Sequence, residues 1–218
     1  MEKDIELTSK GIKKASEGEP IRNIDDVEKL KNHFREKGKD GKLHKYYVFL
    51  IVGLNTALRV SDIVALKVQD IKDGVIRIKE KKTRKAKQFK MNDYLKETLE
   101  KWIKQENLQD DEYIFYSNMT KSGARSDGRE NKTFDRKTQH IDKSVLYKAF
   151  SKAVKERNLP IHYSNHCLRK TFAYHLYLKT KDLGLLQTLL NHSSTAVTLR
   201  YIGITQDVIN DTMSEFML

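Results

Sequence analysis

The sequence predicts an α+β fold that is mainly α-helical and carries one small antiparallel β-hairpin. Apolar residues recur at helical spacing along most of the chain, and one stretch, residues 74–92, changes to the spacing of strands. Only two prolines, Pro20 and Pro160, interrupt the 218 residues, which favours long helices. A chain of this length can bury an apolar core of its own.

Helical periodicity places the predicted helices in seven segments. These segments are residues 23–38, about 46–54, from 61 onward, 92–108, 142–157, 165–180 and 182–192. Asp25 can cap the first helix, and the Ser61 hydroxyl can cap the third, which follows a break near residues 55–58. Asn191 is expected to end the seventh helix, because asparagine tolerates the left-handed conformation that closes many helices.

The predicted β-hairpin has a strongly basic turn. Its charged centre is flanked by five apolar residues, Val75, Ile76, Ile78, Phe89 and Met91. Residues 77–90 hold eight Lys or Arg and one Glu, which gives a local charge of +7. A group of basic side chains in a turn is usually only solvated, but on an already basic protein we expect the side chains of this turn to contact phosphate. The expected contacts are Lys81, Arg84, Lys85 and Lys87.

The remaining segments divide the chain into three parts. Residues 1–20 show no clear period and are expected to form an arm or linker before a single domain over residues 21–204. Residues 205–218 carry apolar side chains at helical spacing and predict an amphipathic helix that packs in trans or in cis. Within the domain, residues 117–140 are almost free of apolar side chains and predict a long functional or disordered loop.

Charge and cysteine content limit the class of protein. The net charge of +12 indicates a polyanionic partner, with a merely basic surface as the simpler alternative. Cys167 is the single cysteine, which excludes a disulfide within the chain. The N-terminus is too charged for a signal peptide, and no apolar run approaches the roughly 18 residues of a membrane helix. We therefore expect a cytoplasmic protein that does not contact a membrane.

Arg59 is the first polar residue that stands in apolar surroundings. It lies between two predicted apolar helices, where an unpaired charge would cost several kcal/mol. Two interpretations follow. Arg59 forms a structural ion pair with Asp62 or Glu28, or its guanidinium is directed at an anionic ligand.

His166 and Arg169 are three residues apart, which places them on one face of a helix. An imidazole beside a fixed cation can accept a proton near neutral pH, although an isolated pair of this kind usually has a structural role. His162 and His166 have the spacing of a zinc pair, but no HExxH motif and no third ligand accompany them, so we expect no metal. A His166–Cys167 protease dyad is disfavoured because neighbouring helical side chains diverge by about 100°.

The last polar segment is "HSSTAVTLRY", from His192 to Tyr201. It is too polar for a buried core helix. Tyr201 is either an ordinary half-buried aromatic residue or a reactive one.

Taken together, five segments resemble the catalytic domain of the tyrosine recombinase (phage integrase) family over about residues 21 to 205. They are "TALRVSD", "EKKTRK", "HCLRKTFAYHL", "LLNH" and "HSSTAVTLRY", and they carry Arg59, Lys82, His166 with Arg169, His192 and Tyr201. Each segment alone is a weak signal, whereas five in the family's order are specific. The resemblance implies the DNA breaking-and-rejoining fold, with the catalytic domain over residues 21–204.

This sequence departs mildly from the family pattern. Ala57, Asp62 and Asn191 stand where the family favours glycine, glutamate and glycine. Lys82 is chosen as the family's hairpin lysine because "KKT" fits its lysine–threonine pair, although Lys81, Lys85 and Lys87 crowd it. Many members carry a separate DNA-clamping domain before the catalytic domain, and residues 1–20 are too short to form one.

The resemblance implies a site-specific DNA recombinase or integrase. Tyr201 would attack a phosphodiester and form a 3′-phosphotyrosyl bond, which releases a 5′-hydroxyl. Arg59 and Arg169 would neutralise the phosphate, because each can offer two parallel N–H donors. His166 would accept the tyrosine proton, and Lys82 would protonate the leaving oxygen. His192 would hydrogen-bond a non-bridging phosphate oxygen.

The resemblance also implies the partners of the protein. Double-stranded DNA is the expected substrate, with self-association into a tetrameric synapse on DNA and a free state that could be monomeric. No metal or nucleotide cofactor is expected, because arginines carry the charge and the phosphotyrosyl ester conserves the bond energy. The alternatives are a type IB topoisomerase-like nicking-closing enzyme and a non-catalytic DNA-binding regulator of the same fold.

Overall fold

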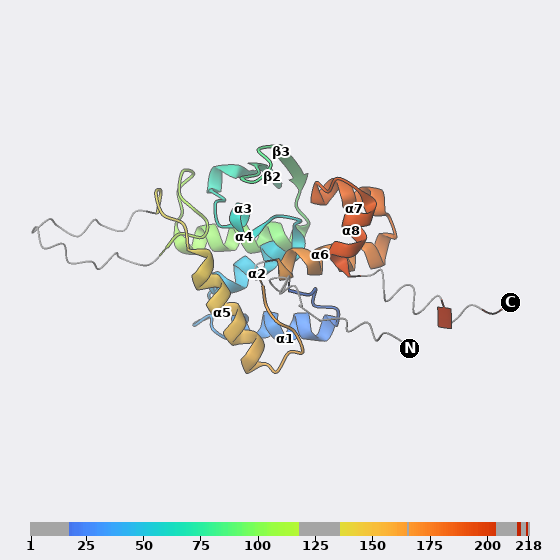
Figure 1. Ribbon diagram of the computed structural model, residues 1–218. Helices are drawn as coiled ribbons and strands as arrows, with labels where there is room; N and C mark the ends of the chain where they lie inside the picture. Colours follow the sequence, from blue (N-terminus) through green and yellow to red (C-terminus); the bar gives the residue numbers. More distant parts are fainter. Residues whose placement is uncertain (1–17, 118–135, 165, 204–212, 215–216, 218) are drawn as a thin grey trace, which may run out of the picture.

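The computed structural model of this protein confirms the predicted fold class. It describes residues 18–117, 136–164, 166–203, 213–214 and 217. These residues form eight α-helices and a small antiparallel sheet that lies at one edge of the molecule, and every long predicted helix is present (Figure 1).

The helices begin and end close to the predicted positions. They are α1 Ile24–Arg35, α2 Lys45–Asn55, α3 Val60–Ile63, α4 Asp93–Glu106, α5 Lys143–Glu156, α6 Cys167–Thr180, α7 Leu183–Leu190 and α8 Thr195–Ile202. Asn191 ends α7 in the left-handed conformation, as predicted (φ 52°, ψ 43°). The predicted break after α2 is also present, since Thr56 has extended backbone angles.

Two of the predicted helix caps are wrong. The side chain of Asn23, not Asp25, caps α1 and accepts a hydrogen bond of 2.8 Å from the Asp25 amide. Asp25 lies in the first turn instead, where its negative charge stabilises the helix dipole. The N-cap of α3 is Arg59, with extended backbone angles and no side-chain cap, and Ser61 lies inside the helix. The chain therefore turns into α3 at the residue whose guanidinium was expected to bind an anion.

The sheet has three strands in the order β1–β2–β3. These are β1 Ile71–Lys72, β2 Val75–Lys79 and β3 Ala86–Lys90. β2 and β3 form the predicted hairpin, with Val75 opposite Lys90 and Lys79 opposite Ala86. β1 was not predicted, because two residues are too few to show a periodic pattern. The basic turn closes with hydrogen bonds from the Glu80 amide to the Lys85 carbonyl (3.0 Å) and from Arg84 back to Glu80 (2.9 Å).

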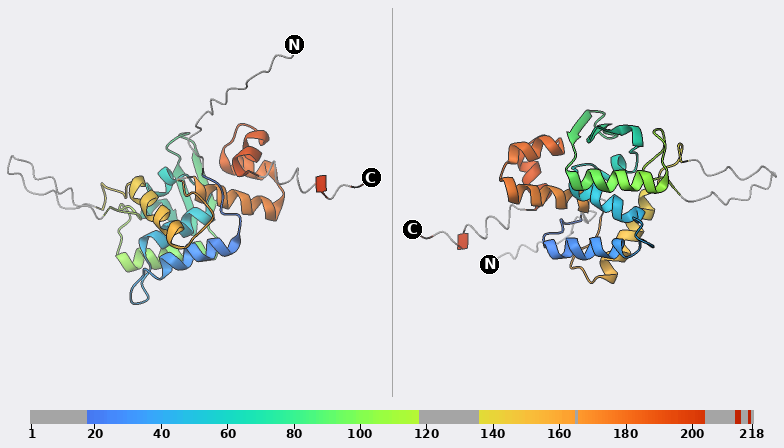
Figure 2. Two further views of the ribbon diagram at one scale, coloured as in Figure 1. Left: turned by 60° about the horizontal axis from the view of Figure 1, so that its bottom comes forward. Right: turned by 180° about the vertical axis from the view of Figure 1, so that it is seen from behind.

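The core is built around α2. This helix is apolar on all sides, as expected for a helix that is enclosed by others, and its residues 47–53 are all buried. α2 packs against α1, α4 and α6, and Figure 2 shows it between α1 and α4. Gly53 allows the close approach of α6, since a Cβ at this position would lie 2.6 Å from Leu168 Cδ1.

A second, smaller apolar cluster joins α6, α7 and α8. Its buried members are Ala57, Ala173, Leu186, Leu190 and Ile202, and Tyr201 is one of the partly buried residues packed against them. These three helices lie together at one side of the molecule (Figure 1). The apolar face of α8 thereby fixes the segment that carries the candidate tyrosine.

The two ends of the described domain meet beside α6. The Ile21 amide donates to Thr171 Oγ1 (2.9 Å), and His175 Nε2 lies 2.9 Å from the Ile21 carbonyl. Arg22 donates to the carbonyl of Gly203, where α8 ends (3.3 Å). Residues 1–17, residues 118–135 and most of the predicted tail helix lie outside the described residues, so the arm, the central part of the long loop and the docking of the tail remain predictions. None of the described helices has the length and apolar content that crossing a membrane requires.

Candidate active site

Arg169 is buried and held from two sides. It lies in the first turn of α6 with only 3% of its surface exposed. Its guanidinium donates to the Ala57 carbonyl and, over 2.7 Å, to the Leu190 carbonyl at the end of α7. Burial, and secondly the charge of Arg59, lower the pKa of its guanidinium from the ordinary value, while Tyr201 and Glu80 oppose the shift. An arginine side chain is not deprotonated in proteins, so Arg169 is a cation at neutral pH. The guanidinium thus has a fixed position in the protein before any ligand binds.

Arg59 has a partner that the sequence did not suggest. Its guanidinium lies 3.1 Å from Glu80 Oε2, and neither of the expected partners, Asp62 and Glu28, forms this ion pair. Asp62 instead accepts a hydrogen bond from the Lys81 amide (2.9 Å), which anchors the hairpin turn to α3. Only 15% of the Arg59 side chain is exposed. Arg59 therefore forms a structural ion pair, although with another partner than expected. Because Arg59 lies near Arg169, the second interpretation, binding of an anionic ligand, also stays a prediction.

The hairpin lysines occupy two different environments. Lys82, in the turn, is exposed, and so are Lys81, Arg84 and Lys85. Lys87 is half-buried on β3, and its Nζ donates to the Leu189 carbonyl over 2.7 Å. Burial, and secondly the charge of Arg169, lower the pKa of Lys87 to about 8. Lys87 was predicted only as a DNA contact, and the structure places it next to the arginines.

His166 lies at the entrance to α6. The helix begins two residues later than predicted, so His166 is its N-cap residue, although its backbone has right-handed helical angles (φ −99°, ψ −9°). The His166 side chain is exposed, and its amide donates to Ser164 Oγ (3.2 Å). This exposed imidazole, three residues before the buried Arg169, is accessible to an incoming ligand.

His192 and Tyr201 lie in contact. Their ring centroids are 4.9 Å apart at an interplanar angle of 78°, the edge-to-face arrangement that aromatic rings favour. Burial, followed by the charges of Arg169 and Arg59, lowers the pKa of His192 to about 4. His192 is thus a neutral imidazole at physiological pH. Its Nδ1 lies 3.1 Å from the hydroxyl of the buried Thr198, which orients the ring.

Tyr201 faces the arginine of its own chain. The electrostatic influence of Tyr201 raises the pKa of Arg169, so the tyrosine hydroxyl lies near that guanidinium. The Lys170 ammonium lies 5.1 Å from the centroid of the tyrosine ring. The first interpretation, an ordinary packed aromatic, explains the ring, but it does not explain a hydroxyl directed at a buried cation.

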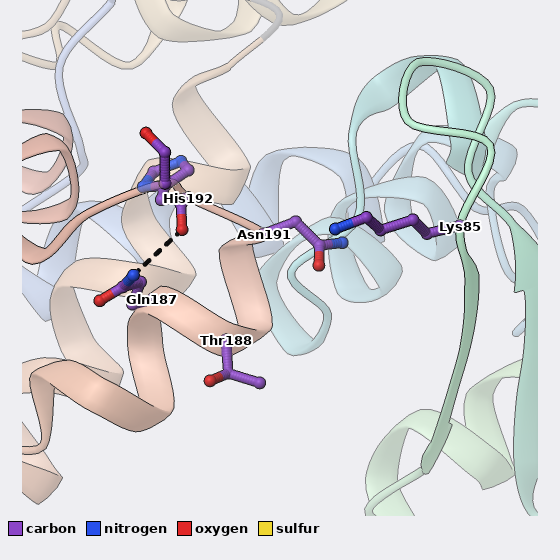
Figure 3. A pocket seen from close by; sticks show the side chains of 6 residues that line it. Lys85, Gln187, Thr188, Asn191 and His192 are labelled. Atoms are coloured by element: carbon purple, nitrogen blue, oxygen red, sulfur yellow. Dashed lines mark hydrogen bonds between the residues drawn. The ribbon is translucent and has the colours of Figure 1, made fainter.

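An open pocket lies between the hairpin and the end of α7. Its lining is entirely polar or charged and consists of Lys85, Gln187, Thr188, Asn191, His192 and Ser193. Figure 3 shows Lys85 extending from the hairpin toward Asn191. Such a lining suits an anionic, hydrogen-bonding ligand such as a sugar-phosphate chain. In the described part of the chain no three His, Cys, Asp or Glu side chains come together as a group that could hold a metal ion.

Sequence comparison identifies the family. The model of the phage integrase family matches residues 23–207, which contain all of the site described above. The chain belongs to the phage integrase family. This confirms the resemblance seen in the sequence and the class of enzyme, the tyrosine-type site-specific recombinases. It does not test the role of any single residue.

Individual relatives in this family differ in how much of their length the chain covers. The chain is 33% identical over 190 residues to "Probable integrase/recombinase YoeC" of Bacillus subtilis (strain 168), which covers 87% of the chain and 91% of that protein. It is 28% identical over 165 residues to "Tyrosine recombinase XerC" of Oceanobacillus iheyensis, which covers 72% of the chain but only 48% of the relative.

Solved structures of integrases share the fold. The XerA recombinase aligns with a TM-score of 0.66 and 19% identity, over 90% of this chain and 64% of that chain. The catalytic domain of bacteriophage HP1 integrase aligns with a TM-score of 0.55 and 17% identity, over 90% of this chain and 95% of that one. At these identities the comparison supports the fold alone.

Proposed function

We propose that this integrase-family protein is a site-specific recombinase in which Tyr201 cleaves DNA and forms a 3′-phosphotyrosyl bond. The observation that carries the proposal is the convergence of Tyr201, His192 and the two arginines, Arg59 and Arg169, within one chain. In the proposed complex a phosphodiester would bind to the two arginines, which influence each other, next to the Tyr201 hydroxyl near Arg169. No metal or nucleotide cofactor takes part in the proposed reaction.

The arginines would supply the charge that the transition state needs. A phosphodiester is already anionic, and its oxygens gain charge as the tyrosine attacks. Arg169 is pre-positioned by two backbone carbonyls, and Arg59 by Glu80. Because these guanidiniums need not reorganise, each can contribute several kcal/mol to transition-state stabilisation in a site that excludes water.

Proton transfers are assigned to His166 and Lys82. His166 is the proposed base for the Tyr201 hydroxyl, and its exposed position at the start of α6 lets it reach a bound strand. Lys82, in the exposed turn, is the proposed acid for the departing 5′-oxygen. Lys87 is the competing candidate for that role, because a pKa of about 8 suits proton transfer near neutral pH. His192 is proposed to hydrogen-bond a non-bridging oxygen.

The proposed partner is double-stranded DNA, on which several copies assemble. Similar proteins have been solved bound to DNA, including XerH with its difH substrate and a lambda integrase tetramer on a Holliday junction. The charge of +12 and the exposed lysines of the turn support the same partner here. In the proposed assembly the catalytic domain spans residues 21–204, and residues 205–218 pack on a neighbouring copy or on their own domain.

A type IB topoisomerase-like activity remains the second candidate, because it would use the same tyrosine chemistry. The two differ in the strand that is rejoined: a recombinase joins ends from two duplexes, and a topoisomerase reseals its own. A non-catalytic regulator is disfavoured, because every role that the chemistry requires has a residue at the site.

The decisive experiment is trapping on nicked suicide substrates that carry candidate sites. We expect a covalent protein–DNA adduct that maps to Tyr201 by peptide sequencing. Tyr201→Phe should abolish the adduct and leave DNA affinity nearly intact, since only the hydroxyl reacts. An adduct that persists in the Phe variant at the parent rate would disprove the assignment of the nucleophile.

A further inference from the structure

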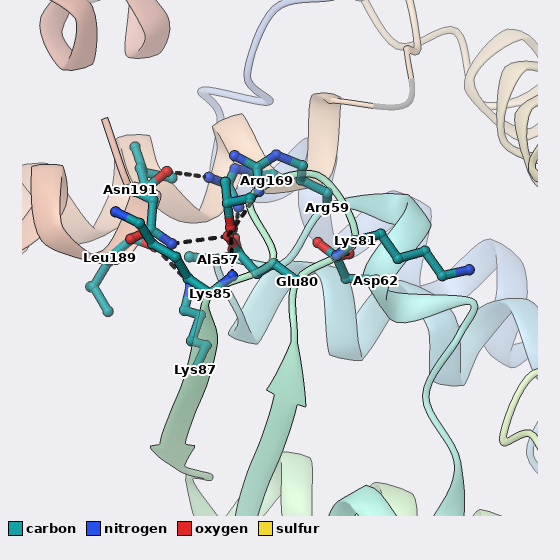
Figure 4. A network of polar contacts seen from close by, with 12 residues as sticks. Ala57, Arg59, Asp62, Glu80, Lys81, Lys85, Lys87, Arg169, Leu189 and Asn191 are labelled. Carbon is teal, nitrogen blue, oxygen red and sulfur yellow. Dashed lines mark hydrogen bonds and ion pairs between the residues drawn. The ribbon is translucent and has the colours of Figure 1, made fainter. Parts of the chain in front are cut away.

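Glu80 is a carboxylate that is completely buried at the edge of the active site. It follows β2 and opens the basic turn, and 0% of its surface is exposed. An ion pair and two hydrogen bonds meet at its Oε2 atom: the Arg59 guanidinium lies 3.1 Å away, and Thr83 Oγ1 (2.7 Å) and Asn191 Nδ2 (2.9 Å) donate to it. Figure 4 shows the carboxylate between Arg59 and Asn191. A buried charge of this kind is tolerated only with such compensation.

The three partners of Oε2 come from three different parts of the site. Arg59 is the N-cap of α3 and one of the two proposed phosphate ligands. Thr83 lies in the hairpin turn, directly after Lys82. Asn191 ends α7 and directly precedes His192. One oxygen atom therefore connects an arginine, the lysine-bearing turn and the histidine-bearing junction.

Glu80 is ionised in this setting. Burial raises the pKa of its carboxyl, but the hydrogen bond from Thr83, the charge of Arg59 and the hydrogen bond from Asn191 together outweigh burial and hold the pKa below its ordinary value. The Arg59 guanidinium has five N–H donors in a fork. It can therefore keep Glu80 on one edge while another edge binds phosphate.

Asn191 contributes its side chain to this network and not only its backbone. Its left-handed backbone (φ 52°) ends α7, a task that glycine performs without strain. The amide group that reaches Glu80 is an addition that glycine would lack. Asn107 ends α4 with nearly the same angles (φ 50°, ψ 50°), and so offers a matched position away from the site.

We propose that Glu80 is a positioning residue for strand cleavage, which holds Arg59, the Lys82-bearing turn and the Asn191–His192 junction in register through a single oxygen. The proposal rests on the proposed function. Glu80 does not touch the reacting atoms and acts through the groups it binds. Asn191 is its specific partner across the gap between the hairpin and α7.

The test measures single-turnover adduct formation and equilibrium DNA affinity for four variants. Glu80→Gln keeps the shape and an accepting oxygen but loses the charge, and Glu80→Ala loses both. Asn191→Gly keeps the left-handed turn and loses only the amide, and Asn107→Gly is its control at the matched turn of α4. Circular dichroism melting and the final adduct amplitude report the folded, reactive fraction separately from the rate.

We expect Asn191→Gly and Glu80→Gln to slow adduct formation roughly tenfold each, the scale of one charge-assisted hydrogen bond, and Glu80→Ala to slow it at least as much. DNA affinity should stay within about twofold of the parent or become tighter, because a negative charge is removed or left unchanged. Asn107→Gly should react at the parent rate. The double variant Glu80→Gln/Asn191→Gly should be slower than either single variant by less than the product of the two effects, because both changes weaken the same contact between Glu80 and Asn191.

Three results would overturn the proposal. Parent-like rates in Asn191→Gly and Glu80→Gln would show that the network is dispensable for cleavage. A fully additive double variant would show that the two residues act separately. Equal losses in rate and in reactive amplitude would show a purely structural role. If the parent protein itself forms no adduct on any candidate site, the proposed function fails first, and that outcome is distinct because it precedes every variant.

Discussion

Arg169→Lys tests whether a fork of donors, and not only a charge, is needed at α6. The arginine donates to two carbonyls that lie on different segments, Ala57 and Leu190. A lysine offers one nitrogen and can reach at most one of them, so one buried carbonyl loses its partner. Loss of a hydrogen bond from a charged donor costs about 1.5–3 kcal/mol. For a chain of this size we therefore expect the melting temperature to fall by roughly 4–8 °C.

The same substitution should slow cleavage more than the stability loss explains. Loss of one transition-state donor typically costs about 10² to 10³ in rate. The assay is single-turnover adduct formation at a temperature well below the melting point of the variant, beside scanning calorimetry. Arg59→Lys is the matched control, because its one ion pair to Glu80 can be kept by lysine. We expect it to lose rate but little stability. A melting temperature of Arg169→Lys within about 1 °C of the parent would refute the argument from the two carbonyls.

Four further predictions concern other parts of the molecule. Lys82→Ala should slow cleavage of an ordinary substrate roughly 10² to 10⁴-fold. Its rate should recover on a substrate with sulfur at the 5′-bridging position, because this sulfur can leave as a thiolate without a proton donor. If the sulfur substrate restores the rate of Lys87→Ala instead, Lys87 on β3 is the general acid. Because His192 has a pKa of about 4 when folded and 6.5 when unfolded, the parent should lose stability relative to His192→Gln as pH falls from 6.5 toward 4, and a pH-independent difference between their denaturation midpoints would contradict this. DNA affinity should fall with salt with a log–log slope of several, at about 0.9 per phosphate contact, and a slope near zero would remove nucleic acid as the partner. Removal of residues 206–218 should weaken cooperative assembly on DNA more than single-site cleavage, and unchanged assembly in gel-shift titrations would leave the tail only a capping role.

Local signals in the sequence were sufficient to predict the long helices, the hairpin and the order of the motifs. Helical spacing and the change of period at residues 74–92 predicted the long helices and the hairpin, and Asn191 was correctly expected to end α7. The caps at Asp25 and Ser61 were wrong because several good capping residues stand close together, and sequence alone does not choose among them.

Contacts between segments that are distant in the chain could not be predicted from the sequence. Glu80 was counted only as the single acid in a basic turn, whereas its partner Asn191 lies 111 residues away in the chain. Such a pair forms only when the hairpin packs on the end of α7, and no periodic pattern reports that. The burial of Lys87 had a signal that could have been used. Lys87 and Phe89 are two residues apart, so they lie on the same face of β3, and this face is the partly buried one.

The hydrogen bond between Arg22 and the Gly203 carbonyl brings residues near the two ends of the domain together. A unit whose two ends meet at one point can be joined to other polypeptide on either side without crossing its own surface. Such a unit is modular: a flanking segment exchanged at Arg22 or after Gly203 changes what the domain is attached to, and the arginines and the tyrosine keep their places.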